Sequence, residues 1–224
     1  MRKNSILGLL FIVGALLCGL TGLCVGTGNA IEVAHLSPVT VAGLTSGTVS
    51  PGDKVLVEGY VSEENEVVCP MGNLVAYLYE HRHISINDSG QAKAKRWRKW
   101  YEVTPPLLLN LPDGAVQVEN DDYRIDNPRV VEGPKTWVSG SHIRYAVTRY
   151  EGIAVGDPVI AVGTVRADHQ VPHIEAEFVA RGTREEYIAG QRTGGLISCG
   201  GSAVVGFIGG VIMFWEQVRR FFRR

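Results

Sequence analysis

One short segment combines cationic and aromatic side chains, the residue types that bind anionic surfaces. It could lie against phospholipid head groups or a protein partner, or bind single-stranded nucleic acid on an OB-like face. Alternatively, it is a solvated loop leading into a strand whose tryptophans pack inward. We expect partner or head-group binding and no nucleic acid at these residues: Lys93, Lys95, Arg96, Trp97, Arg98, Lys99 and Trp100.

Two histidines and one cysteine are the candidates for metal binding. His81 and His83 are two residues apart, so they share a face if the chain is extended there. Cys69 is the only cysteine between residues 27 and 193, and no CxxC pair accompanies it. Two imidazoles and one thiolate would suit zinc, but a structural zinc site needs four ligands. We therefore expect no metal, no cofactor and no disulfide in this region.

Catalytic chemistry has little support in the sequence. Ser141 and His142 are adjacent, so in an extended strand they point to opposite faces and cannot pair directly. The sequence contains no GxSxG, HExxH or phosphate-binding loop motif. We expect no catalytic residue, and we interpret four carboxylates as turn and surface groups: Asp53, Glu58, Glu151 and Asp157.

The elements that would position these residues are mainly β-strands. Runs of β-branched and aromatic residues alternate with turn residues such as proline, glycine and aspartate. In the first run, Val55, Val57 and Val61 share one face, opposite Tyr60. We predict an antiparallel barrel or sandwich with OB-like elements, and one short helix at 184–191. The predicted strands are 55–61, 74–86, 97–103, 115–119, 142–149, 159–165 and 174–180.

A faint internal repeat relates two of these strands. The stretch 52–61 recurs as 156–165: each begins with Gly-Asp and has an inner glycine, Gly59 or Gly163. An inner glycine permits a bend or a close approach of two backbones, as in the first strand of OB-like barrels. The repeat indicates either two barrel halves or two strands that converged on one role.

The two ends of the chain have membrane character. Segments 6–26 and 194–215 carry no charged side chain and are long enough to cross a bilayer as helices. The first could be a secretory signal, but its apolar run is longer than a signal needs, so we predict an uncleaved helix.

Basic flanks predict the orientation of these helices. Arg2 and Lys3 lie in the N-terminal segment 1–5, and four arginines lie in the tail 216–224. Because short basic flanks stay cytoplasmic, we predict a two-pass integral membrane protein with both termini cytoplasmic. The domain 27–193, which has more acidic than basic residues, would then be extracytoplasmic.

Small residues recur four apart in both predicted membrane helices. Glycine is common in such helices, which is one explanation. The other is that the small residues let the two helices pack on each other or across a homo-oligomer. The residues of this predicted packing ladder are Gly14, Gly22, Gly26, Ser202, Gly206 and Gly210.

The order of these pieces resembles the GIDE-domain family, which includes the MULAN-like mitochondrial E3 ubiquitin ligases. The resemblance extends over nearly the whole chain, including the layout with two membrane helices. The matching stretches are 55–61, Cys69-Pro70-Met71-Gly72 before 75–79, 97–103, the hairpin 106–118, 149–165 and 178–186.

Two departures shape what the resemblance implies. Leu107 and Asn110 stand where the family hairpin usually has phenylalanine and aspartate. The ligases carry a zinc-binding RING after the second membrane helix, whereas residues 216–224 contain no cysteine or histidine. We predict a RING-less relative that acts as a membrane-anchored interaction or scaffold module for a protein or lipid partner. The alternative is an E3 ubiquitin ligase-like activity, as in the resembled family.

Overall fold

The computed structural model describes residues 29–87, 89–138, 144–166, 171–191 and 193. The chain divides into two compact units, one of Leu36–Arg184 and one of Met1–His35 with Glu185–Arg224. All the β-strands belong to the first unit. In the second unit, the described residues 29–35 and 185–191 are helical.

Five strands of the first unit form a closed barrel. They are β1 (Lys54–Val61), β5 (Leu107–Leu111), β6 (Gly114–Val118), β10 (Pro158–Arg166) and β11 (His173–Arg181). Their order is β10-β1-β5-β6-β11, and pairing of β10 with β11 closes the ring. This confirms the predicted mainly β fold and, of the two predicted architectures, the barrel. A short strand, β7 (Arg124–Asp126), extends the sheet beyond β11.

The sequence analysis predicted an antiparallel barrel, but two strand pairs of this sheet are parallel. β11 runs parallel to β6 and also to β7. Parallel neighbours need a long connection between them, and the chain between β6 and β11 supplies it. Strand periodicity carries no information about such long-range pairing, so the sequence pattern could not reveal it.

The barrel interior is filled by apolar side chains from every strand. Val57, Leu109 and Val116 are fully buried, as are Ala161 and Val179. The predicted faces of the first strand are confirmed, since Val55, Val57 and Val61 are buried while Tyr60 is 60% exposed. Leu56 is also buried, so the strand is covered on both sides at that point.

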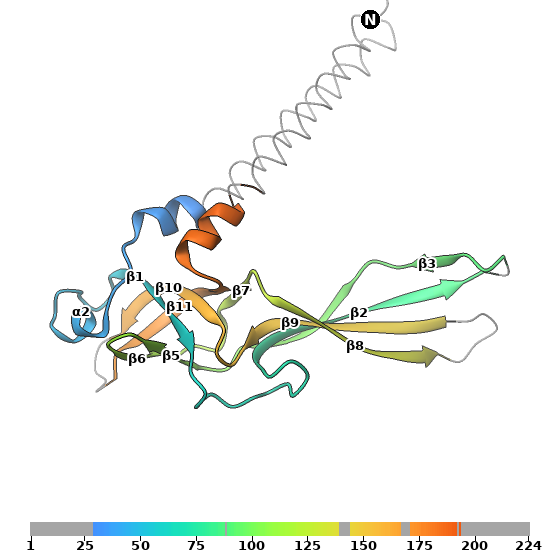
Figure 1. Ribbon diagram of the computed structural model, residues 1–224, viewed down its shortest axis with the longest axis horizontal. Coiled ribbons are helices and arrows are strands. Elements are labelled where there is room, and N and C mark those ends of the chain that lie inside the picture. The colour runs from blue at the N-terminus through green and yellow to red at the C-terminus, as the bar shows by residue number, and fades with distance from the viewer. Residues whose placement is uncertain (1–28, 88, 139–143, 167–170, 192, 194–224) are drawn as a thin grey trace, which may run out of the picture. The chain divides into compact units, whose positions relative to one another are not determined.

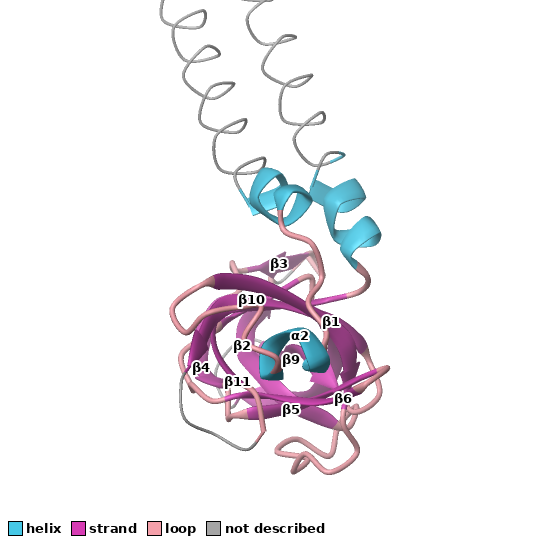
Figure 2. Cartoon of the chain, turned by 90° about the vertical axis from the view of Figure 1, so that its left-hand side faces the viewer, coloured by secondary structure: helices cyan, strands magenta, loops and turns pink. Residues whose placement is uncertain are grey.

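A short helix that the sequence analysis missed, α2 (Val41–Thr45), lies over one end of the barrel (Figure 2). Its N-cap is Thr40, whose side-chain oxygen accepts from the Gly43 N–H at 3.1 Å. Val41 and Leu44 pack against the barrel core. The prediction of a single short helix was therefore wrong: helix 184–191 is present, but α2 and the helical residues 29–35 accompany it.

The other five strands form a second sheet that extends away from the barrel (Figure 1), which we call the arm. The strands of the arm are β2 (Leu74–Ile86), β3 (Ala92–Ala94), β4 (Arg98–Val103), β8 (Arg129–Val138) and β9 (Arg144–Ala154). The order is β3-β2-β9-β8, with β4 beside β2. At the base of the arm, Val75, Ala76 and Ile153 join the barrel core.

The internal repeat forms two neighbouring strands of a single barrel. β1 and β10 pair antiparallel, with Val55 opposite Gly163 and Gly59 opposite Val159. A Cβ atom on Gly163 would lie 2.1 Å from the Glu175 carbonyl oxygen, and one on Gly59 would lie 2.5 Å from that of Asn110. Both glycines therefore serve the close backbone approach that the sequence predicted, and the two repeated stretches are adjacent strands rather than two halves of the barrel.

The predicted membrane helices, 6–26 and 194–215, lie outside the described residues, and so does the packing ladder of small residues within them. Across the described ranges, no helix combines the length and apolar character that a membrane span requires. Two-pass topology and an extracytoplasmic domain thus remain predictions from the sequence.

Candidate binding face of the arm

Strand register in the arm sorts its side chains onto two opposite faces. Along β2, Tyr79, His81 and His83 are two residues apart and share one face. Directly opposite residues of an antiparallel pair also share a face. On β4, Tyr101 lies opposite Tyr79 and Arg98 lies opposite His81. Tyr101 and Arg98 therefore join the face of the two histidines.

Two lysines continue this face toward the far end of the arm. Lys93 on β3 lies opposite Ser85, and the Lys95 backbone N–H donates to the His83 carbonyl oxygen at 2.9 Å. Because Ser85 and His83 alternate on the same face of β2, Lys93 and Lys95 follow them there. Three cations thus form a row along the segment 92–103, which contains β3 and β4 and which we call the outer segment: Lys93, Lys95 and Arg98.

A β-bulge adds a tryptophan to the same face. Tyr79 pairs with Tyr101 and Glu80 pairs with Lys99, so Trp100 is an extra residue between the two pairs. Its ring lies 4.8 Å from that of His81 and 6.2 Å from that of Tyr79. We call this surface the cationic–aromatic face: Lys93, Lys95, Arg98, Trp100 and Tyr101 on the outer segment, with Tyr79, His81, His83 and Ser85 on β2.

The end of this face nearest the barrel is a cluster of tyrosines. The Tyr79 ring stacks on Tyr101 at 4.9 Å and lies 5.1 Å from Tyr150 of β9. Tyr77 contacts Tyr101 and Tyr150 edge to face. Burial raises the pKa of Tyr79 and of Tyr150, so both hydroxyls stay neutral well above neutral pH. The cluster therefore adds aromatic surface without adding negative charge.

On the opposite side of the arm, which we call the paired face, the charges nearest the barrel form ion pairs with one another. Arg149 lies 2.6 Å from Glu80 and 2.9 Å from Glu151, and Lys99 lies 2.5 Å from Glu102. These five residues occupy one face because Glu80 lies opposite both Arg149 and Lys99.

Trp97 is held on the paired face between two guanidinium groups. The Cζ of Arg82 lies 4.4 Å from the ring centroid, and that of Arg149 lies 4.3 Å from it. Cation–π contacts of this kind fix the indole against the sheet. Trp97 is half-buried as a result, whereas Trp100 on the other face is 66% exposed.

The cations of the cationic–aromatic face have no comparable compensation. Lys93, Lys95 and Arg98 are exposed, and no carboxylate in the part of the chain that the structure describes pairs with them. Trp100 and Tyr101, 43% exposed, stand beside them. An exposed cluster of cations and aromatics is a signature of a binding surface.

The predicted binding segment is thus divided between environments. Lys93, Lys95, Arg98 and Trp100 lie on the cationic–aromatic face, but Trp97 and Lys99 lie on the paired face. Arg96 is exposed in the connection between β3 and β4. The idea that both tryptophans pack inward was wrong for Trp100. Sequence reasoning missed the contribution of β2, where the alternation of Tyr79, His81, His83 and Ser85 was the available signal.

The candidate metal ligands lie in two different places. The rings of His81 and His83 are 5.4 Å apart on the shared face that the sequence predicted. Cys69 is buried in a small cluster with Leu74, Tyr77 and Ala154. Among the described residues, no three histidine, cysteine, aspartate or glutamate side chains are grouped to hold a metal ion. Ser141 and His142 lie outside those residues.

The four carboxylates interpreted as turn and surface groups have structural partners. Asp53 accepts from Ser50 N, Glu58 accepts from Arg184 N, and Glu151 pairs with Arg149. For Asp157 the surface interpretation was wrong, because this residue is buried and only 4% exposed. It accepts from Ala154 N at 2.9 Å and pairs with Arg129 at 2.5 Å, which ties the start of β8 to the turn before β10.

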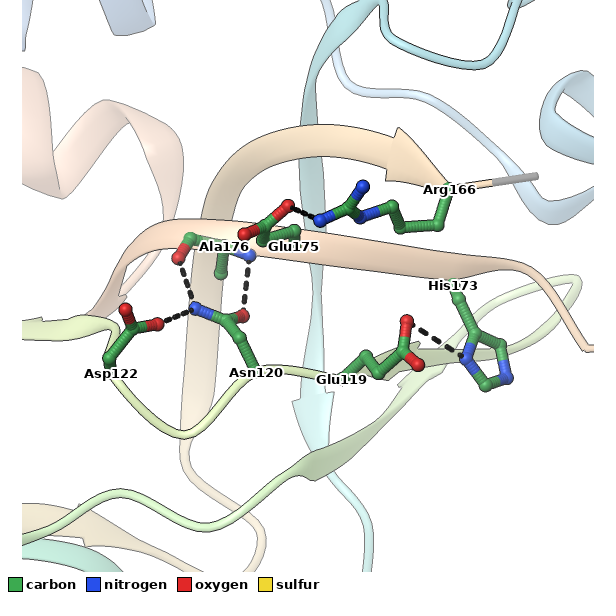
Figure 3. A network of polar contacts seen from close by, with 7 residues as sticks. All are labelled: Glu119, Asn120, Asp122, Arg166, His173, Glu175 and Ala176. Carbon is green, nitrogen blue, oxygen red and sulfur yellow. Dashed lines mark hydrogen bonds and ion pairs between the residues drawn. The ribbon is translucent and has the colours of Figure 1, made fainter.

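A polar network on the barrel surface is also structural (Figure 3). The Asn120 side chain accepts from Ala176 N and donates to Ala176 O, both at 2.8 Å, and it donates to Asp122. It therefore substitutes for a strand residue beside β11. Arg166 pairs with Glu175 across β10 and β11 in the same region.

No family model, no curated protein and no solved structure matches this chain. The arm's two faces are therefore the features from which a function can be inferred.

Proposed function

We propose that this chain is a membrane-anchored interaction module of the GIDE type, a two-pass protein whose β domain binds a partner through the cationic–aromatic face. The observation that supports this most directly is the difference between the two faces of the arm. One face neutralises Arg149 and Lys99 with its own carboxylates. The other leaves Lys93, Lys95 and Arg98 exposed beside Trp100.

The exposed cations of this face are complementary in charge to an anionic partner. A folded domain gains little from holding like charges together in the open, since neighbouring cations repel each other. An anionic partner would offset that repulsion and speed association by electrostatic steering. Tryptophan, tyrosine and arginine are also the residues that most often carry binding energy at interfaces. The partner expected here is therefore anionic.

The test is recovery of a partner, meaning co-purifying protein and phospholipid, from native membranes with the full chain. The variant Lys93→Ser, Lys95→Ser, Arg98→Gln removes three positive charges from the cationic–aromatic face. A matched control, Lys54→Ser, Lys135→Ser, Arg166→Gln, removes three from other surfaces. Surface substitutions of this kind alter stability by less than about 0.5 kcal/mol, so both variants should fold.

We expect wild type and the control to recover the same partner in similar amounts, and the face variant to recover much less. The difference should be largest at low ionic strength, because salt screens exposed charges. Equal recovery by all three proteins, at low and high salt, would contradict the proposal.

A further inference from the structure

We infer that the surface recognised by the cationic–aromatic face is the head-group layer of an anionic phospholipid membrane. The inference rests on the proposed function and makes it specific, since it chooses a lipid surface over an acidic protein. It depends on how the cations and aromatics are arranged on the arm, and on how weak such a contact would be for an untethered protein.

The cations form a row on an open sheet face rather than a pocket. Lys93 lies on β3 and Lys95 comes directly after that strand, still bonded to β2, so about 7 Å separates their Cα atoms. Arg98 follows on the same edge of the arm, opposite His81. Exposed lysine and arginine side chains on a flat face suit a laterally extended array of negative charges, such as phosphates in a head-group layer.

The aromatic residues beside the row fit the same surface. Trp100 is 66% exposed and Tyr101 is 43% exposed, and the bulge places both on the side of Arg98. Tryptophan and tyrosine concentrate at membrane–water interfaces, where an apolar ring meets a polar head-group region. Exposed rings would also suit a protein partner, so the choice of a lipid surface rests on the open row of cations together with rings suited to the interface.

The strength of the contact favours a tethered domain. Each basic residue near an anionic leaflet strengthens binding about fivefold, so three give about a hundredfold. That is weak for a free protein in solution. A domain already anchored to the membrane has a millimolar effective concentration of its surface, at which weak contacts become populated. The contact would then set how the arm lies on the membrane rather than recruit the chain to it.

Lysine footprinting of the full chain in nanodiscs tests this at single residues. One set of nanodiscs contains phosphatidylcholine alone, and the other contains about one third phosphatidylglycerol. Amine-reactive labelling is followed by mass spectrometry of each lysine peptide. Lys93 and Lys95 report on the cationic–aromatic face. The internal controls are Lys99, which lies opposite Glu80, and Lys135, which shares a face with Arg82 because both lie opposite Val147.

We expect Lys93 and Lys95 to be labelled at least threefold more slowly in the anionic nanodiscs, with no change at Lys135. Protection should fall in 0.5 M salt and in Arg98→Gln, because both weaken attraction to phosphate. Equal labelling of Lys93 and Lys95 in the two lipids would overturn the lipid inference.

The outcome is distinguishable from failure of the proposed function. If the lipids give no protection but a protein partner recovered from native membranes protects Lys93 and Lys95, the interaction module stands and the lipid assignment is wrong. If neither protects them and partner recovery is also independent of this face, both proposals fail.

Discussion

The barrel and the arm are both built from β-strands, but the strands of the two regions are stabilised in different ways. In the barrel, β10 has five consecutive buried residues, and its neighbours approach so closely that Gly163 has no room for a methyl group. In the arm, β4 is exposed along almost its whole length. Burial makes the barrel dependent on packing, whereas the arm depends on ion pairs, ring contacts and the ladder itself. The barrel thus holds most of the buried core, and the arm holds the exposed cations and rings.

The largest expected effect comes from filling the space beside a glycine in each region. In Gly163→Ala the new Cβ would meet the Glu175 carbonyl oxygen and the Ala176 Cα, backbone atoms that move only if the barrel opens. We expect a loss of at least about 3 kcal/mol in the free energy of unfolding. In Gly133→Ala of the arm, the nearest atom is the Thr148 side-chain oxygen, which can turn aside only by giving up its 3.3 Å bond to the Pro134 carbonyl oxygen, so about 1–2 kcal/mol is expected. Thermal unfolding compares the two, and similar losses would contradict the division.

A smaller effect is expected from changing one amide to a carboxylate in each region. Asn120→Asp in the barrel removes the donor to the Ala176 carbonyl oxygen and brings a second negative charge near Asp122. We expect a loss of about 2 kcal/mol at pH 7. Acid should reduce it, because the carbonyl contact raises the folded-state pKa of the new carboxyl above its unfolded value, and the protonated form donates again.

The counterpart in the arm is Asn87→Asp. The Asn87 side-chain oxygen accepts from Gln91 N and from the Ser89 hydroxyl, both at 2.8 Å, and a carboxylate preserves both bonds. The donated bond that it loses, to the Gln91 side-chain oxygen, is exposed and long at 3.4 Å. Denaturant unfolding of both variants at pH 7 and pH 4.5 measures the losses in the free energy of unfolding. For Asn87→Asp we expect almost no loss at pH 7. A loss at Asn87 as large as that at Asn120 would show that the arm is as demanding as the barrel.

The smallest effect concerns the turn between β5 and β6. Asp113 accepts from the Ala42 N–H at 3.0 Å, and hydrogen bonds from the backbone, that of Ala42 first, lower the pKa of its carboxyl. A lowered folded-state pKa gives stability that is present above the unfolded pKa and is lost as pH falls below about 4. Asp113→Asn should therefore flatten the acid side of the stability profile slightly. An unchanged profile below pH 4 would show that this bond contributes nothing.

The sequence predicted local features of both regions better than long-range ones. The bounds of β2 agree with the predicted run 74–86, because turn residues flank a long β-prone stretch. β8 was missed because Gly133 and Pro134 interrupt it, and proline argues against a strand; the structure accommodates it on an edge strand with an irregular register. The parallel pairs of β11 depend on contacts between distant segments that no local pattern records.

For the cationic–aromatic face, the sequence singled out the segment 93–101 but could not divide it between the two sides of the arm. Simple alternation would place Trp97 and Trp100, three residues apart, on opposite faces, but it would also separate Trp100 from Tyr101. The bulge places Trp100 and Tyr101 together and leaves Lys99 facing Glu80. The position of a bulge depends on the partner strand, so the face could be assigned only from the paired register.

The most direct test of the account uses the two tryptophans of this segment as a matched pair. Trp100→Ala removes an exposed ring from the cationic–aromatic face, and Trp97→Ala removes the ring held between Arg82 and Arg149. Partner recovery from native membranes and thermal stability are measured for the full chain in both variants. The account predicts that Trp100→Ala loses most partner recovery with unchanged stability, while Trp97→Ala is less stable but recovers its partner once folded. The reverse pattern, or equal recovery by both variants and wild type, would contradict it.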